Sequence, residues 1–194
     1  MTPKFIAHRG NIQGPNPHFE NNIDSIRHAL MHGFGVEVDL RCEYLAYYRG
    51  NNFYLSHDKN FTAEITPTIN IKSLDNENIL VHCKDNESYN YLMSNFSEYY
   101  YLDFFKQEDE MEVKTFRGKR LFHQNNTENW DKNTVLVWLG DFRSFRDKIG
   151  YKITCNICPS PCSIITDFPE SFTRCWNDSN SWNGMVLPPL EYRV

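Results

Sequence analysis

Short runs of β-branched and aromatic residues alternate with polar, helix-like stretches along this chain of 194 residues. Such a rhythm is typical of strands that alternate with helices around a parallel sheet. The runs that qualify as strands are 4–7, 35–41, 53–56, 79–84, 99–104, 119–122, 134–139, 152–156 and 163–166. These are enough for a closed barrel, so we expect an α/β fold. An eight-fold (β/α)8 barrel usually takes about 250 residues, so if the chain forms one, several of its helices must be short or missing.

The charge of the chain is mildly acidic, with 20 Lys and Arg against 25 Asp and Glu and a formal net charge of −5. This balance gives no long-range attraction to nucleic acid or to an anionic membrane. No window approaches the roughly 18 consecutive apolar residues of a membrane helix, and the N-terminus enters a strand-like run too soon for a signal peptide. We therefore expect one cytoplasmic domain over residues 1–194, without a nucleic-acid partner or stable membrane insertion.

Four of the six cysteines gather late in the chain, at Cys155, Cys158, Cys162 and Cys175. Cys155 and Cys158 can bind one zinc ion, but a strong zinc signal has a second paired knuckle, and here the other partner stands alone. A disulfide in an oxidising compartment is another alternative. In a chain of this length without a secretion signal, we expect free or buried thiols.

One helix and one hairpin are well marked. Asn22 can cap a helix whose apolar residues recur on one face as far as Leu30, and Gly33 supplies a left-handed stop. The segment 44–55 reads as a hairpin with its tight turn at Arg49-Gly50-Asn51-Asn52, because Gly and Asn tolerate positive φ.

The run 35–41 alternates apolar and charged side chains with a period of two. Glu37, Asp39 and Arg41 therefore face one side of the predicted strand, and the intervening apolar residues face the other. In a barrel, the apolar side meets the outer helices and the charged side faces the interior. Glu37 and Asp39 then lie roughly 7 Å apart along the strand, close enough to share a divalent cation. An edge strand with one solvated face is the alternative that this strand alone leaves open.

The run 79–84 alternates in the same way, which places His82 and Lys84 on one face. A neutral imidazole can bind a metal, and an ammonium group can neutralise a phosphate oxygen. Taken alone, a buried histidine beside a lysine is more often an ordinary hydrogen-bonded pair.

Two further histidines come directly after predicted strands. His8 is followed by Arg9, whose planar guanidinium suits a phosphate, and His57 follows the run 53–56. The C-terminal ends of barrel strands form the mouth where barrel active sites lie. Two histidines there can act as general base and general acid.

Together these residues form an ordered pattern: His8-Arg9-Gly10, Glu20-Asn21-Asn22, Glu37-Val38-Asp39 and His57-Asp58. The pattern resembles that of the glycerophosphodiester phosphodiesterase family, which usually reads His-Arg-Gly, Glu-Asn-Thr, Glu-x-Asp and His-Asp in the same order. The resemblance is strong over residues 4–60 and loose thereafter. The chain is thus similar to a divergent, compact member of the superfamily of phospholipase C-like phosphodiesterases.

The resemblance implies a compact TIM-type barrel that cleaves a small-molecule phosphodiester with a divalent ion, Mg²⁺ or Ca²⁺. It implies that His8 and His57 are the acid–base pair and that Arg9 clamps the phosphate. A cyclic phosphate intermediate, later opened by water, is also implied by the resemblance.

The metal ligands that the resemblance implies are Glu37 and Asp39, with Glu20 supporting the metal or orienting the first histidine. On the third strand the family usually reads Glu-x-Lys, whereas this sequence keeps Lys84 for phosphate binding and has His82 in place of the glutamate. Replacing a carboxylate by an imidazole removes a negative charge and weakens the binding of a hard cation. It shifts preference toward Mn²⁺ or Zn²⁺.

Three functions stay open on the sequence. The first is metal-dependent hydrolysis of a glycerophosphodiester or a related phosphodiester by histidine acid–base catalysis. The second is a non-catalytic barrel that binds a phosphorylated ligand, which the replaced carboxylate on the third strand favours. The third is a phospholipase D-like transfer that ends in a stable cyclic phosphate.

Overall fold

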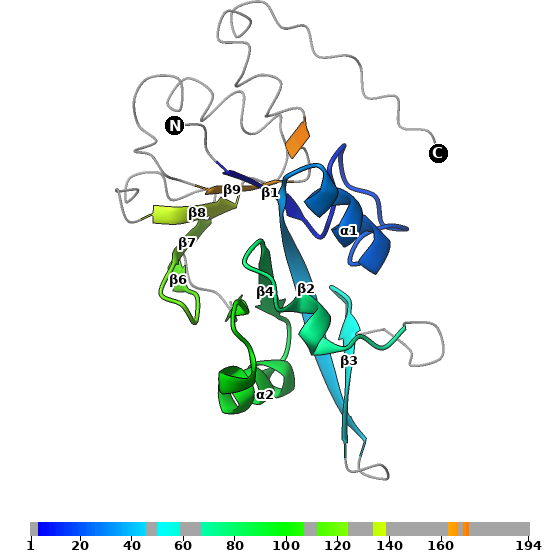
Figure 1. The fold of residues 1–194 in the computed structure, drawn as a ribbon, viewed down its shortest axis with the longest axis vertical. Helices are drawn as coiled ribbons and strands as arrows, with labels where there is room; N and C mark the ends of the chain where they lie inside the picture. Colours follow the sequence, from blue (N-terminus) through cyan, green and yellow to red (C-terminus); the bar gives the residue numbers. More distant parts are fainter. Residues whose placement is uncertain are drawn as a thin grey trace, which may run out of the picture.

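The computed structural model describes residues 4–45, 50–58, 67–106, 112–123, 134–138, 163–166 and 169–170. The strands are β1 (Lys4–His8), β2 (Gly35–Leu45), β3 (Gly50–Leu55), β4 (Ile79–Cys83), β5 (Asp103–Phe105), β6 (Glu112–Lys114), β7 (Arg120–His123), β8 (Thr134–Trp138) and β9 (Ser163–Thr166) (Figure 1). The helices are α1 (Ile23–Met31) and α2 (Asn86–Asn95), with short 3₁₀ helices η1 (Ile71–Leu74) and η2 (Phe96–Glu98). Among the described helices, none has the length and apolar character needed to cross a membrane.

All these strands belong to one sheet with the order β5-β4-β2-β1-β9-β8-β7-β6, and β3 pairs with β2 beside this path. Neighbours run parallel except in the β2–β3 and β6–β7 pairs. The protein is therefore α/β with a mostly parallel sheet, as the sequence predicts. The first strand lies beside the last, but β5 and β6 end the path, and a closed barrel is not found in the described residues.

Most of the predicted strands overlap strands of the structure, with shifts at the ends. The run 99–104 forms a strand only from Asp103, because Tyr99 ends the 3₁₀ helix η2 instead. Strand β6 and helix α2 have no counterpart among the predicted elements. The run 152–156 lies outside the described residues, as do Cys155, Cys158, Cys162 and Cys175.

Helix α1 begins and ends where the sequence predicts. The Asn22 side chain accepts a hydrogen bond from the Asp24 backbone N–H at 2.8 Å, and Gly33, just beyond the helix, has a φ of 80°. Ile26 and Ala29 on its inner face are fully buried in the main apolar cluster.

Strands β2 and β3 form the predicted hairpin, but the predicted position of its turn is wrong. Gly50, Asn51 and Asn52 belong to β3, where they pair with residues 43–45 of β2. The connecting residues 46–49 lie outside the described ranges. Backbone pairing with a long neighbouring strand outweighs the local turn preference of Gly and Asn.

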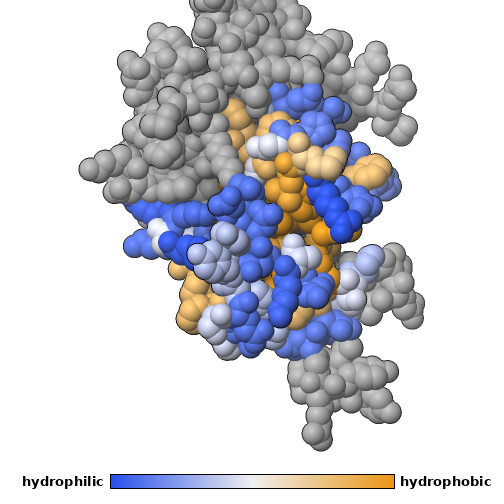
Figure 2. Space-filling view, in the orientation of Figure 1, coloured by the Kyte–Doolittle hydropathy of each residue, from blue (hydrophilic) through white to orange (hydrophobic). Residues whose placement is uncertain are grey.

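The two faces of the sheet carry different side chains. Val36, Val38 and Leu40 of β2 lie on the face that packs against the helices, in one cluster with Ile26 of α1 and Leu92 of α2. Apolar residues gather over the sheet between α1 and α2 in Figure 2, framed by hydrophilic side chains. The opposite face holds a smaller buried cluster: Ile6, Leu80, Phe105, Val113, Leu121 and Ile165. The charged residues of β2 share this second face, as the alternation of the run 35–41 predicts.

The carboxylate of Asp75 organises the segment that enters β5. It accepts hydrogen bonds from the backbone N–H groups of Tyr100, Tyr101 and Leu102 at 3.0, 2.6 and 2.8 Å. Partial burial raises the pKa of Asp75, but the three hydrogen bonds outweigh it and bring the pKa below the ordinary value of 3.8. Asp75→Asn, which turns one acceptor oxygen into a donor, is expected to lower the free energy of unfolding at neutral pH by about 1–2 kcal/mol.

The pH dependence of this effect has a defined sign. A lowered folded-state pKa contributes stability above the unfolded pKa, and the contribution is lost as the pH falls through the folded pKa. The difference between the wild type and Asp75→Asn should therefore shrink between neutral pH and about pH 3. Urea denaturation at both pH values measures it, and an equal difference at both would contradict the assignment.

Candidate functional site

The candidate site lies at the C-terminal ends of three neighbouring parallel strands. In the register of the sheet, His8 of β1 pairs with Glu37 of β2, and Asp39 of β2 pairs with His82 of β4. Paired residues of parallel strands point to the same face, so these four side chains share the face opposite the helices. Lys84 directly follows β4 and joins them, with its ammonium 3.8 Å from Asp39 Oδ1.

Glu37, Asp39 and His82 form a group that can hold a metal ion. Each offers one ligand atom, and these atoms lie within 4.8 Å of one another. His82 Nδ1 is 3.6 Å from Glu37 Oε1 and 3.3 Å from Asp39 Oδ1. The two carboxylic residues are only 2% and 1% exposed. Burying two carboxylates this close together is costly unless a cation lies beside them.

The imidazole of His82 is held from the side by an aromatic ring. It stacks on Phe105 of β5 with ring centroids 4.5 Å apart and an interplanar angle of 15°. Its Nε2 is buried and has no hydrogen-bond partner within the part of the chain that the structure describes. The stacking fixes the ring with Nδ1 turned toward the two carboxylates.

Arg9 closes the other side of the group. Its Nε lies 2.9 Å from Asp39 Oδ2, its Nη1 donates to Glu20 Oε2 at 3.0 Å, and its backbone N–H donates to Glu37 Oε2 at 3.3 Å. Arg9 has a φ of 53°, in the left-handed region that a non-glycine residue rarely adopts. This backbone conformation turns the Arg9 side chain toward Asp39 and Glu20 and the Arg9 N–H toward Glu37.

His8 belongs to the same buried group. Its side chain is 12% exposed, and its Nε2 lies 3.8 Å from Glu37 Oε2. As the last residue of β1, His8 thereby places its imidazole beside the Glu37 carboxylate at the C-terminal ends of the parallel strands.

Glu20 lies beside Arg9 rather than in the group of three. Its two oxygens accept from Arg9 Nη1 and from Asn11 Nδ2, the latter at 3.2 Å. This places Glu20 where it orients the guanidinium of Arg9.

Asn21 belongs to the site through contacts with Asp39 that the sequence pattern does not indicate. Its Nδ2 donates to Asp39 Oδ2 at 3.1 Å, and its Oδ1 accepts from the Asp39 backbone N–H at 2.9 Å. Its own N–H donates to the carbonyl of Arg9 at 2.9 Å, and its φ is 55°. The available signal was the Glu20-Asn21-Asn22 triplet, in which an asparagine suits a left-handed position.

His57 lies at the exposed rim. Its ring is 44% exposed, and its Nδ1 is 2.9 Å from Asp58 Oδ1. Buried Arg41 of β2 fixes its backbone, because Arg41 Nη2 donates to the His57 carbonyl at 2.5 Å. The N–H of the preceding Ser56 donates to the Asp39 carbonyl at 3.1 Å. These bonds attach His57 to the strand of the two carboxylates and leave its ring facing solvent.

The charges of the group are strongly coupled. Burial raises the pKa of Asp39, but the hydrogen bond with His82 and the charge of Arg9 outweigh it and hold the pKa well below the ordinary value. Burial lowers the pKa of His82, but its bonds to Asp39 and Glu37 raise it overall. Burial also lowers the pKa of Arg9, and the charge of Asp39 reverses this effect. The group therefore keeps Asp39 ionised and favours the protonated imidazole of His82.

The fold and this group define an α/β protein with paired carboxylates, an imidazole and two cationic side chains at one edge of a parallel sheet. No protein-family model, no curated protein and no solved structure matches the chain. What the site can do follows from its own side chains.

Proposed function

We propose that the chain is a metal-dependent phosphodiesterase that hydrolyses a glycerophosphodiester or a related small phosphodiester. The observation that carries the proposal is the meeting of Glu37, Asp39 and His82 with the cations of Arg9 and Lys84 at one end of the sheet. Carboxylates collect a divalent cation, and an arginine and a lysine beside them suit a phosphate. Cleavage of a phosphodiester would use both the divalent cation and the two basic side chains.

The residues fit a divalent cation. Glu37, Asp39 and His82 would hold it, and deprotonation of His82 on binding would free the nitrogen that now faces the carboxylates. Two carboxylates and one imidazole accept Mg²⁺ or Ca²⁺, and the imidazole favours Mn²⁺ or Zn²⁺. Glu20 supports this centre through Arg9. When bound, the ion would supply Lewis acidity to a phosphoryl oxygen.

The histidines carry the proton transfers in this proposal. One of His8 and His57 takes the proton from a hydroxyl of the substrate as its oxygen forms a bond to phosphorus, and the other protonates the leaving alcohol as its bond breaks. Arg9 and Lys84 stabilise the charge on the remaining phosphate oxygens. Water then opens the resulting cyclic phosphate.

The TIM-type barrel with short or missing helices remains a proposal for the fold. It is supported by β9 lying beside β1, since the first and last strands are neighbours in such a barrel. It is also supported between β5 and β6, the two ends of the strand path. There the Phe116 N–H donates to the Phe104 carbonyl at 2.7 Å, so the turn after β6 lies along β5.

A cytoplasmic location is likewise proposed. The described cysteines Cys42 and Cys83 are free thiols, as a reducing compartment allows. Burial raises the pKa of both to about 12, which makes them poor nucleophiles.

A second candidate is a non-catalytic barrel that binds a phosphorylated ligand. It is favoured by His82, whose protonated ring, together with Arg9, can neutralise Glu37 and Asp39 without a metal. A third candidate is a transferase that stops at the cyclic phosphate.

Hydrolysis of glycerophosphocholine and of an aryl phosphodiester, followed by phosphorus NMR with and without a chelator, separates these functions. We expect turnover that a chelator abolishes and that added Mg²⁺ or Mn²⁺ restores. A cyclic phosphate that accumulates would select the transferase. Thermal stabilisation by phosphate compounds without turnover would support the non-catalytic binding function. Turnover that is unchanged by the chelator would reject the metal-dependent mechanism.

A further inference from the structure

A pocket lies at the other end of the sheet from the candidate site. It has a volume of about 390 Å³, which is within the range of roughly 300–1,000 Å³ of small-molecule sites. Its lining comes from three segments that precede strands: Glu77 before β4, Tyr100 and Tyr101 before β5, and Arg117 and Lys119 before β7. The buried apolar cluster of Ile6, Leu80, Phe105, Val113, Leu121 and Ile165 belongs to the sheet between the two ends.

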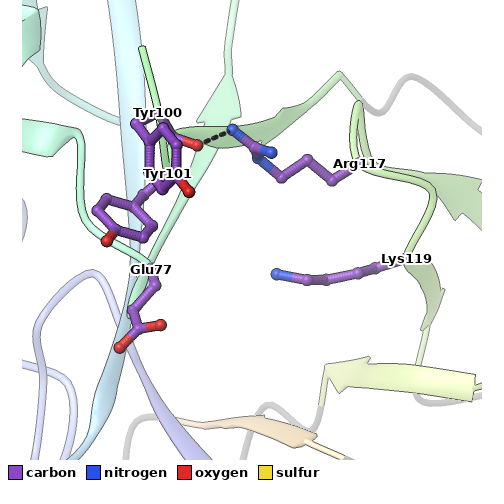
Figure 3. A pocket seen from close by; sticks show the side chains of 5 residues that line it. All are labelled: Glu77, Tyr100, Tyr101, Arg117 and Lys119. Carbon is purple, nitrogen blue, oxygen red and sulfur yellow. Dashed lines mark hydrogen bonds between the residues drawn. The ribbon is translucent and has the colours of Figure 1, made fainter.

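The lining divides into two walls of opposite character. Figure 3 shows the two tyrosines and Glu77 on one side and the side chains of Arg117 and Lys119 reaching in from the other. One wall is aromatic and acidic, and the facing wall is basic. A ligand that satisfies both walls carries a positive group at one end and a negative group at the other.

Hydrogen bonds to the main chain fix the aromatic wall. Asp75 accepts from the N–H groups of Tyr100 and Tyr101, and Arg117 donates to the carbonyls of Tyr100 and Leu102, the latter at 2.9 Å. The backbone that carries both rings is therefore held on both sides. A wall fixed in this way needs little ordering when a ligand binds.

The aromatic wall suits an alkylated ammonium group. The rings of Tyr100 and Tyr101 stand almost perpendicular, at 82°, with centroids 4.6 Å apart. They remain 76% and 47% exposed. The two rings pack edge to face, and an exposed tyrosine ring beside a carboxylate such as Glu77 attracts a quaternary ammonium through cation–π attraction and charge.

The basic wall suits an oxyanion. Lys119 Nζ lies 2.9 Å from Asp103 Oδ2, and this ion pair holds the ammonium group in place. The Lys119 side chain is 38% exposed, and its ammonium group has further N–H donors for a ligand. Arg117 is positioned by its bonds to two carbonyls, neither of which neutralises its charge. A phosphate that reaches both cations gains charge-assisted hydrogen bonds.

We propose that this pocket binds a small zwitterion that joins a quaternary ammonium to a phosphate, with phosphocholine as the representative compound. The ammonium lies against Tyr100, Tyr101 and Glu77, and the phosphate lies against Arg117 and Lys119. The pocket is separate from the candidate site and does not depend on the function proposed for it.

Isothermal titration calorimetry of the full chain with phosphocholine tests the proposal. Tyr100→Ala and Glu77→Gln alter exposed side chains, so both variants should fold, and circular dichroism checks that they do. We expect Tyr100→Ala to weaken binding about tenfold and Glu77→Gln about threefold to tenfold. Choline alone and inorganic phosphate alone should each bind at least about tenfold more weakly than phosphocholine.

Two control variants locate the ligand. Arg27→Gln removes an exposed cation from α1, and Glu37→Gln changes the candidate site, so neither should alter the affinity for phosphocholine. Loss of binding in Glu37→Gln with full binding in Tyr100→Ala would place the ligand in the candidate site and overturn the proposal. No binding up to roughly 10 mM, or inorganic phosphate binding as tightly as phosphocholine, would also overturn it.

Discussion

His8→Ala is expected to lower kcat for phosphodiester hydrolysis by about 10²–10⁴-fold, the range for loss of a general acid or base. His8 ends β1 with its Nε2 3.8 Å from Glu37 Oε2, and its side chain is only 12% exposed. The imidazole therefore lies against the carboxylates that would hold the ion. Steady-state kinetics with an aryl phosphodiester measure the loss, and a shifted pH profile of the residual activity would mark an acid–base role.

The matched control is His32→Ala at the C-terminal end of α1. Its ring is exposed, and its Nδ1 donates a local hydrogen bond to the His28 carbonyl at 2.9 Å. Activity within about twofold of the wild type is expected for His32→Ala. Equal activity of wild type and a folded His8→Ala would remove His8 from the mechanism.

Asp103→Ala is expected to lower the free energy of unfolding by about 3–5 kcal/mol, the cost of breaking a buried charged network. Asp103 begins β5 and is 1% exposed. Its carboxylate accepts from Thr115 Oγ1 at 3.1 Å and from the Arg117 N–H at 3.0 Å, and it pairs with Lys119 Nζ at 2.9 Å. These three bonds attach the turn between β6 and β7 to β5, where the described sheet has no strand pairing.

Thermal denaturation should show Asp103→Ala melting roughly 6–20 °C below the wild type. Asp24→Ala is the control, since Asp24 lies at the exposed start of α1 with its side chain 83% exposed. A change within about 0.5 kcal/mol is expected there. If both variants are equally stable, the contacts of Asp103 do not hold the two halves of the sheet together.

The sequence predicts those parts of the site that depend on strand periodicity. The alternation of the run 35–41 places Glu37 and Asp39 on one face, and the same period in β4 places His82 beside Asp39. Helix α1 was predictable because Asn22 and Gly33 are local signals at its ends. In each case the information lies within a few consecutive residues.

Other features depend on contacts between distant segments, which periodicity does not contain. Asn21 reaches Asp39 only because both it and Arg9 adopt left-handed backbone conformations. Helix α2 has a polar sequence and depends on capping by Asp85, whose side chain accepts from the Ser88 N–H. The pocket near Tyr100 is assembled from three separate segments. The turn position in the β2–β3 hairpin was set by pairing rather than by Gly and Asn preference.

The proposed function depends on Glu37, Asp39 and His82 together binding a divalent cation. Crystals soaked in Mn²⁺ and measured at the manganese absorption edge test it most directly. We predict one anomalous peak in contact with all three side chains, and its loss in Glu37→Gln. The absence of an anomalous peak at these side chains, with His82, Arg9 and Lys84 keeping their contacts with the two carboxylates, would contradict this prediction.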